Sequence, residues 1–237
     1  MSLSQAPSVS AASGQFTRGL QRALPIVLSY IPVGFTYGVI ANKAGISDFN
    51  VILMSILVFA GSAQFIAVGM IAGGTGFLPI ILTTFVVNLR HLLMSASLST
   101  WMSNWSKPLL TLFSYEITDE TFAMNSALGE ELNVRKTEAF TVNAISHFSW
   151  VFGSILGLFA SSLITDIKPF GLDFALPGMF IGLIVLQVNT LAKLVTAICA
   201  AVLGTILFYL GIQQFYIIIA TVIAATFGLC FELWIKR

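Results

Sequence analysis

The sequence predicts an all-α integral membrane protein with about eight membrane-embedded helical elements. Of its 237 residues, 57% are hydrophobic and only 9% are charged, whereas a soluble domain has about 25% charged residues. Several uncharged stretches reach the length of about 20 residues that crosses a bilayer as a helix. The few ionisable residues inside such stretches must face protein or water rather than lipid. Together these features predict that most of the chain lies in the membrane.

The first 17 residues are expected to be a flexible N-terminal tail, and residues 18–237 a single polytopic transmembrane domain. The first 15 residues are rich in Ser and Ala and uncharged. No basic residue there precedes an apolar core with a small-residue cleavage site, so we expect no cleaved signal peptide. The first span runs from Ala23 to Asn42, flanked by Arg18 and Arg22.

The next stretch, Phe49–Leu89, is uncharged and long enough for two helices, with the turn predicted at Gly73–Gly76. The second helix of this pair continues to Trp101 and carries Asn88, Arg90 and His91 near its middle. An Arg near the bilayer midplane costs about 2.5–3.5 kcal/mol on insertion scales. These residues therefore indicate either a functional site or a structural ion pair that locks two helices.

The segment Pro108–Gly129 has apolar ends and three acids in its centre, Glu116, Asp119 and Glu120. On one helix these acids would share a face, because they are spaced i, i+3 and i+4. The segment is either an ordinary loop or a membrane element whose acids face inward, where they could pair with Arg90.

The second half contains further uncharged or nearly uncharged stretches: Ala139–Thr165, Phe174–Ala192 and Leu194–Phe231, the last divisible into two helices at Gly211. If Pro108–Gly129 spans, the chain has eight elements and both ends are cytoplasmic. If it does not, there are seven elements and the N-terminus is outside. The positive-inside count is seven against three for both topologies. We prefer eight elements, because the alternative exports the basic residues beside the first span.

A weak internal repeat relates Gly34-x-x-x-Gly38 to Gly153-x-x-x-Gly157 and suggests halves at 18–129 and 135–237. The halves would be parallel with eight elements and inverted with seven. Chance similarity between two glycine-rich helices explains the same pattern. We expect these four glycines, together with Gly61, to serve helix packing, since small residues let helices approach closely.

The segment Phe59–Phe65, FAGSAQF, places four small residues and Gln64 in an apolar helix. Gln64 offers both a donor and an acceptor. This pattern suits a small polar ligand, and it equally suits tight packing in which Gln64 bonds across helices.

The chain carries no convincing catalytic set. His91 and His147 have no metal-ligand spacing, and no Ser/His/Asp signature, Walker loop or GxGxxG motif is present. Cys199 and Cys230 lie in apolar stretches and are expected to be small buried hydrophobes. We therefore expect no enzyme, no metal and no cofactor. The absence of a basic patch argues against nucleic acid as a partner.

Four segments resemble the AzlC family: FAGSAQF at 59–65, NLRHLLMSASL at 88–98, EITDETFAM at 116–124 and GLDFALPGMF at 171–180. The resemblance covers residues 18–231, with the four segments in the family's order. AzlC proteins are the larger subunits of branched-chain amino-acid exporters. The resemblance implies efflux of valine, leucine or isoleucine, in some members methionine, across the bacterial cytoplasmic membrane. It also implies a small, separately encoded membrane partner of the AzlD type.

A zwitterionic amino acid needs a cation for its carboxylate and an acceptor for its ammonium group. Arg90 can supply the first with its planar guanidinium, and Gln64, Asn88 or an acid of the 116–120 segment the second. Protonation of an acid or of His91 could couple export to protons, although a uniporter fits the same residues. The candidate binding or coupling residues are Gln64, Asn88, Arg90, His91, Glu116, Asp119 and Glu120. The alternative function is a non-transporting scaffold or assembly subunit.

We predict that the C-terminus is cytoplasmic, because Lys236 and Arg237 follow an uncharged span. A C-terminal reporter that is active only in the periplasm should stay silent, and one that is active only in the cytoplasm should give signal. A strong periplasmic signal would contradict both topologies.

Overall fold

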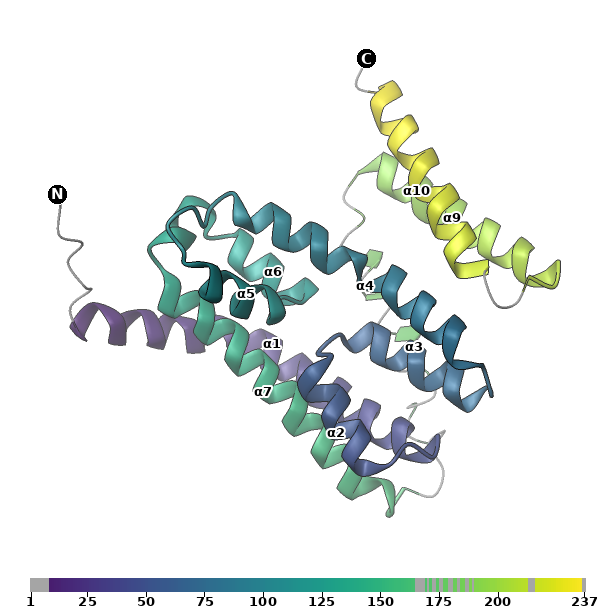
Figure 1. The fold of residues 1–237 in the computed structure, drawn as a ribbon, viewed down its shortest axis with the longest axis horizontal. Helices are drawn as coiled ribbons and strands as arrows, with labels where there is room; N and C mark the ends of the chain where they lie inside the picture. Colours follow the sequence, from purple (N-terminus) through teal and green to yellow (C-terminus); the bar gives the residue numbers. More distant parts are fainter. Residues whose placement is uncertain are drawn as a thin grey trace.

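The computed structural model describes residues 9–164, 190–212 and 216–235, with scattered positions between 169 and 188. Within these residues all regular structure is helical (Figure 1). The elements are α1 (Val9–Lys43), α2 (Asp48–Leu57), α3 (Gly61–Ala72), α4 (Phe77–Ser99), α5 (Lys107–Tyr115), α6 (Asp119–Ser126), the 3₁₀ helix η1 (Gly129–Asn133), α7 (Lys136–Ser161), α9 (Leu191–Tyr209) and α10 (Tyr216–Ile235). Of the described helices, α1, α4, α7 and α9 are long and apolar enough to cross a membrane.

The two longest helices, α1 and α7, lie side by side along most of their length (Figure 1). They run parallel. Near their N-terminal ends Arg18 bonds Glu138, and near their C-terminal ends the Ser161 hydroxyl donates to the Asn42 side chain. Helices α2 and α3 pack against this pair, α4 contacts α3, α5 and α6, and α9 forms a hairpin with α10.

Glycines allow α1 and α7 to approach each other closely. A Cβ atom added at Gly34 would lie 2.8 Å from the Trp150 carbonyl oxygen, and one at Gly153 would lie 2.6 Å from that of Ile31. Gly38 and Gly157 are packed still more tightly against the facing backbone. Any side chain at these positions would separate the helices, so the small-residue spacing determines how closely they pack.

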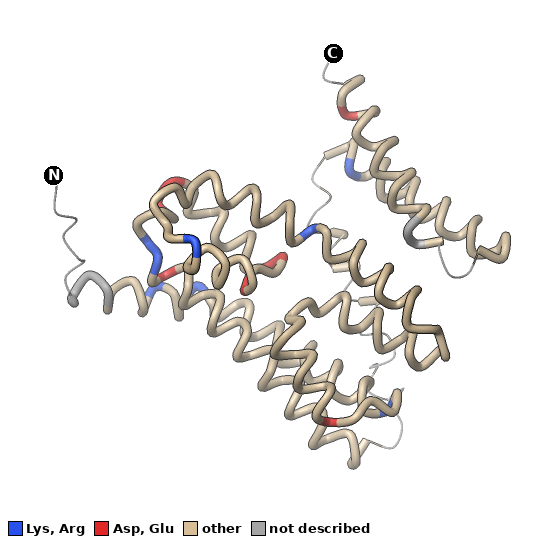
Figure 2. The backbone as a smooth tube through the Cα atoms, viewed as in Figure 1, with Lys and Arg blue, Asp and Glu red and all other residues tan. Residues whose placement is uncertain are grey.

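The parallel arrangement brings basic residues of both helices to one end of the pair. Arg18 Nε and Arg22 Nη1 lie 3.1 Å and 2.9 Å from the Glu138 carboxylate, and Arg135 Nη1 lies 3.6 Å from it. Figure 2 shows charged residues gathered at this end, whereas long stretches of the other helices are uncharged. If α1 and α7 both cross the membrane in this parallel arrangement, an odd number of crossings lies between them, and the eight-element topology has three.

The first helix expected in Phe49–Leu89 is in fact broken. Helix α2 ends at Leu57 and α3 begins at Gly61, and Phe59 between them has φ 41°. This left-handed conformation is unfavourable for a residue with a side chain. It persists here because Phe59 is buried and packs against rings from α1 and α7.

Pro108–Gly129 also differs from the expectation of one helix with three acids on one face. It forms α5 and α6, separated at Glu116–Thr118. The Thr118 side chain accepts a hydrogen bond from the Thr121 amide, and the Thr121 side chain accepts one from the Thr118 amide. This capping box starts a new helix at Asp119. Glu116 therefore points in a different direction from Asp119 and Glu120.

Of the other expectations from the sequence, some agree with the structure and some do not. The turn at Gly73–Gly76 and the division at Gly211 are present, with Gly74 and Gly211 at positive φ. Helix α1 begins at Val9, inside the segment expected as a tail, and Cys230 is exposed on α10 rather than buried. Part of Phe174–Ala192 lies outside the described residues. The count of eight elements and the repeat stay predictions.

We predict that Gly153→Ala destabilises the protein by about 1–3 kcal/mol, the usual cost of overpacking a tight contact. The new methyl group would lie 2.6 Å from the Ile31 carbonyl oxygen. The matched control is Gly69→Ala on α3, where a Cβ meets nothing within 4 Å and Ala favours the helix. Thermal unfolding of both purified variants checks this, and equal stability of the two would contradict the proposed packing.

Candidate functional site

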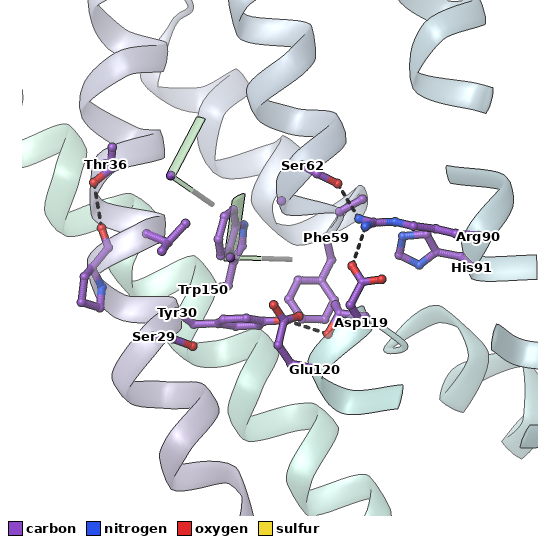
Figure 3. A pocket seen from close by; sticks show the side chains of 17 residues that line it. Ser29, Tyr30, Thr36, Phe59, Ser62, Arg90, His91, Asp119, Glu120 and Trp150 are labelled. Carbon is purple, nitrogen blue, oxygen red and sulfur yellow. Dashed lines mark hydrogen bonds and ion pairs between the residues drawn. The ribbon is translucent and has the colours of Figure 1, made fainter. Parts of the chain in front are cut away.

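A cavity of about 480 Å³ lies between α1, the α2–α3 break, α4, the start of α6 and α7 (Figure 3). Its polar lining includes Ser29, Tyr30, Thr36, Ser62, Arg90, His91, Thr118, Asp119 and Glu120. Of the candidate residues named from the sequence, it brings together Arg90, His91, Asp119 and Glu120. Arg90 and His91 lie on α4, whereas Asp119 and Glu120 lie on α6. The contact between these two helices brings the cation to the acids.

Arg90 is the centre of the polar side of this cavity. Its Nη1 lies 2.5 Å from Asp119 Oδ2, and its Nη2 donates to the Ser62 hydroxyl at the start of α3 (Figure 3). Its Nε is buried and has no hydrogen-bond partner in the described part of the chain. Arg90 thus connects three elements, and the pairing with Asp119 compensates a charge placed midway along a membrane-length helix.

His91, the next residue on α4, contacts the break between α5 and α6. Its Nδ1 lies 2.8 Å from the Ile117 carbonyl oxygen, which would place the ring proton on Nδ1. Its Nε2 is buried and, among the described residues, has no hydrogen-bond partner. That nitrogen would then be a free acceptor at the cavity.

Glu120 lies on the α1 side of the cavity. Its carboxylate accepts a hydrogen bond of 2.6 Å from the Tyr30 hydroxyl, which also lies 2.6 Å from the Thr118 hydroxyl. Arg90 is paired with Asp119, and Glu120 is held by the hydrogen bond from Tyr30. Among the described residues, the cavity lining has one guanidinium group and two carboxylates.

The opposite wall is apolar and is formed by Pro32, Val33, Phe59 and Trp150. A hydrogen bond to a residue outside the cavity lining holds Trp150 in place: its indole Nε1 donates to Gln64 Oε1 over 3.1 Å. Gln64 is fully buried and its amide nitrogen lies 3.4 Å from the Ser55 hydroxyl. Gln64 thus supports the wall and does not line the cavity.

Two further sequence candidates also lie outside the cavity lining. Glu116 is paired with His147 of α7, whose Nδ1 lies 3.2 Å from both carboxylate oxygens. Asn88 is partly buried on α4, and its Oδ1 has no hydrogen-bond partner within the described chain.

Sequence reasoning missed Ser62, Tyr30 and His147. Ser62 lies in the FAGSAQF segment, where one Ser among small residues is a weaker signal than the amide of Gln64. Tyr30 gave no signal, because one Tyr in an apolar span is commonplace. His147 was visible as the one ionisable group of its span, and its carboxylate partner became evident only from the fold.

The fold and the site define a polytopic helical membrane protein with a charged, apolar-walled cavity between its helices. The AzlC protein family matches residues 25–164, more than half of the chain. The chain belongs to the AzlC family.

Relatives from several organisms support this assignment. The inner membrane protein YgaZ of Escherichia coli is 32% identical over 86% of this chain and 87% of its own length. The branched-chain amino acid transport protein AzlC of Bacillus subtilis is 30% identical over 73% of this chain and 67% of its own length. An uncharacterized membrane protein of Archaeoglobus fulgidus is 33% identical over 73% and 75%. No solved structure matches the chain.

We predict that Arg90→Ala lowers stability by about 1–3 kcal/mol, because it leaves the partly buried Asp119 without its cation. Combining it with Asp119→Asn should restore much of the loss. Asp48→Asn is the matched control, because Asp48 is exposed and bonds only Asn42 among the described side chains. The measurement is the yield and thermal unfolding of detergent-purified protein. A double variant no more stable than Arg90→Ala would argue against the pairing.

Proposed function

We propose that this chain is the large subunit of a secondary exporter of branched-chain amino acids. Its substrates would be valine, leucine and isoleucine, with methionine as a further candidate. The chain would act in a bacterial cytoplasmic membrane with a small AzlD-type partner subunit, with both ends in the cytoplasm. Membership of the AzlC family and the name of the Bacillus subtilis relative support this proposal.

The observation that carries the proposal is the ion pair between Arg90 and Asp119 at the cavity. A zwitterion can replace this pair without leaving a charge unpaired. Its carboxylate takes the place of Asp119 on the guanidinium, and its ammonium group contacts Asp119 or Glu120. When the ammonium group contacts Asp119, the exchange replaces one ion pair with two and leaves neither Arg90 nor Asp119 unpaired, which matters because an unpaired charge away from water is costly.

The apolar wall supplies the second part of the recognition. Val33, Phe59 and Trp150 would contact an aliphatic side chain while the charged groups hold the backbone of the amino acid. The cavity volume of about 480 Å³ lies within the range of small-molecule sites. A charged side chain on the substrate would face this wall without a partner, which favours aliphatic amino acids over basic or acidic ones.

The partner subunit would cover part of the apolar surface that α4 leaves uncovered. Phe77, Phe85, Leu92 and Leu93 on this helix are all more than half exposed. Lipid would cover the remainder. The residues of α4 that face the cavity and those that face outward thus lie on different sides of one helix.

The test is leucine uptake and counterflow in vesicles that contain the purified complex. Arg90→Lys keeps the charge but loses the bidentate geometry, so we expect transport per folded complex to fall about tenfold or more, the scale of one charge-assisted hydrogen bond. Asp119→Asn should impair transport similarly. Asp48→Asn, exposed and away from the cavity, is the matched control.

Two results would count against the proposal. Near-normal transport by folded Arg90→Lys and Arg90→Ala would remove Arg90 from recognition. Absence of transport by the unaltered complex, with its partner present, would favour the alternative of a scaffold subunit. Lysine and glutamate serve as competitor controls, since neither should displace leucine.

A further inference from the structure

His147 makes contacts with both of its ring nitrogens, outside the cavity. Its Nδ1 lies 3.2 Å from both carboxylate oxygens of Glu116, and its Nε2 lies 3.1 Å from the Ser55 carbonyl oxygen. The imidazole ring stacks on Phe59, with 4.0 Å between ring centroids and 18° between planes. His147 therefore connects α7 to the end of α5 and to the broken helix.

The Ser55 carbonyl is available because the helix is broken there. The amides of Val58 and Phe59 both bond the Met54 carbonyl, whereas in a continuous helix the Phe59 amide would bond Ser55. The next carbonyl, that of Ile56, accepts a hydrogen bond from the Tyr115 hydroxyl. Side chains from α7 and α5 thus satisfy backbone groups that the break leaves without a helical partner.

The contacts of His147 determine how many protons it shares with Glu116. A neutral imidazole has one donor and one acceptor nitrogen, an ionised carboxylate only accepts, and so does a backbone carbonyl. Both contacts of His147 can be hydrogen bonds only if the pair holds one proton more than neutral His147 and ionised Glu116. That proton is either on the imidazole, giving an ion pair, or on the Glu116 carboxyl, which then donates to Nδ1.

We propose that His147 and Glu116 form a proton-binding site that controls the helix break at Val58–Ala60. Binding takes one proton from water, and both contacts form. When the proton leaves to water, the single remaining N–H can serve Ser55 or Glu116 but not both. One contact then becomes a repulsion between two acceptors, and the break loses a support. The site is distinct from the Arg90 cavity, and its link to transport rests on the proposed function.

The break is part of the cavity wall, so the proton site and the cavity are connected by direct contacts. Phe59 and Ala60 line the cavity, and the Phe59 ring lies between His147 and the edge of Tyr30. Release of the Ser55 carbonyl would free Phe59 from its strained conformation and change the apolar wall. A proton gradient could thereby bias the shape of the substrate cavity.

The pH effects of other titratable groups near the break must be distinguished from those of His147 and Glu116. Tyr115 faces His147, with 5.9 Å between ring centroids, and Tyr30 faces Phe59. The cavity adds the groups of α4 and α6, which are Arg90, His91, Asp119 and Glu120. Variants of the pair itself are therefore needed, since a pH effect alone could arise from any of these groups.

The experiment is amide hydrogen exchange of the segment 54–61 in the purified complex without substrate, at a series of pH values and corrected for intrinsic exchange. In the unaltered protein, protection should fall about tenfold or more as pH rises through the loss of the shared proton, the scale of one buried hydrogen bond. Glu116→Gln should keep the protection at every pH, because its amide can donate to Nδ1 while Nε2–H serves Ser55.

His147→Gln is the second variant, which keeps a donor for Ser55 but removes the ring that holds the proton. It should also lose the pH dependence. Glu130→Gln, an exposed acid of η1, is the matched control and should behave like the unaltered protein. Protection of the unaltered protein that does not change with pH would overturn the proposal. So would a normal pH dependence in either folded variant of the pair.

Transport is measured on the same samples and separates the two proposals. Under both, Glu116→Gln should retain leucine counterflow and lose transport driven by a pH gradient. If the unaltered complex does not transport but the exchange results hold, the proposed function fails and the proton site stands. If leucine is transported but exchange is independent of pH, the proton site fails and the exporter stands.

Discussion

The requirement that no charge stays unpaired among apolar helices governs how this chain folds around α4. Arg90 lies midway along a membrane-length helix, and two groups from two other elements bond to it: Asp119 of α6 and Ser62 of α3. These bonds hold α6 and the start of α3 against α4. Without Arg90, Asp119 of α6 would lie between apolar helices without a cation to pair with. The same interaction that makes the helix compatible with a membrane therefore creates the polar side of the cavity.

The parts of the fold that follow from composition and spacing were predictable. Uncharged length located α1, α4, α7 and α9, because crossing a bilayer requires a fixed run of apolar residues. The glycines at 34, 38, 153 and 157 stood out by their spacing, and the structure places them where α1 and α7 are closest. Arg90 and the acids of 116–120 stood out because ionisable residues are costly in apolar surroundings.

What the sequence did not reveal depends on contacts between distant segments. The break at Phe59 has no proline, and its carbonyls are satisfied by His147 and Tyr115, which are far away in the chain. A local reading therefore favours a continuous helix. The separation of Glu116 from Asp119 depends on the cap at Thr118, a signal that apolar periodicity obscures. The support that Gln64 gives Trp150 could likewise be found only once α3 and α7 were placed together.

The close parallel pairing of α1 and α7 has a mechanical consequence. Backbone meets backbone along this contact, and Glu138 joins three arginines at one end of it. Two helices held so tightly cannot slide or separate without losing many contacts at once. If they act as a fixed frame in the transporter proposed above, access to the cavity would be opened by elements that move against that frame, such as α4, α6 and the broken helix. Two of these elements, α4 and α6, carry the charged residues of the described cavity lining.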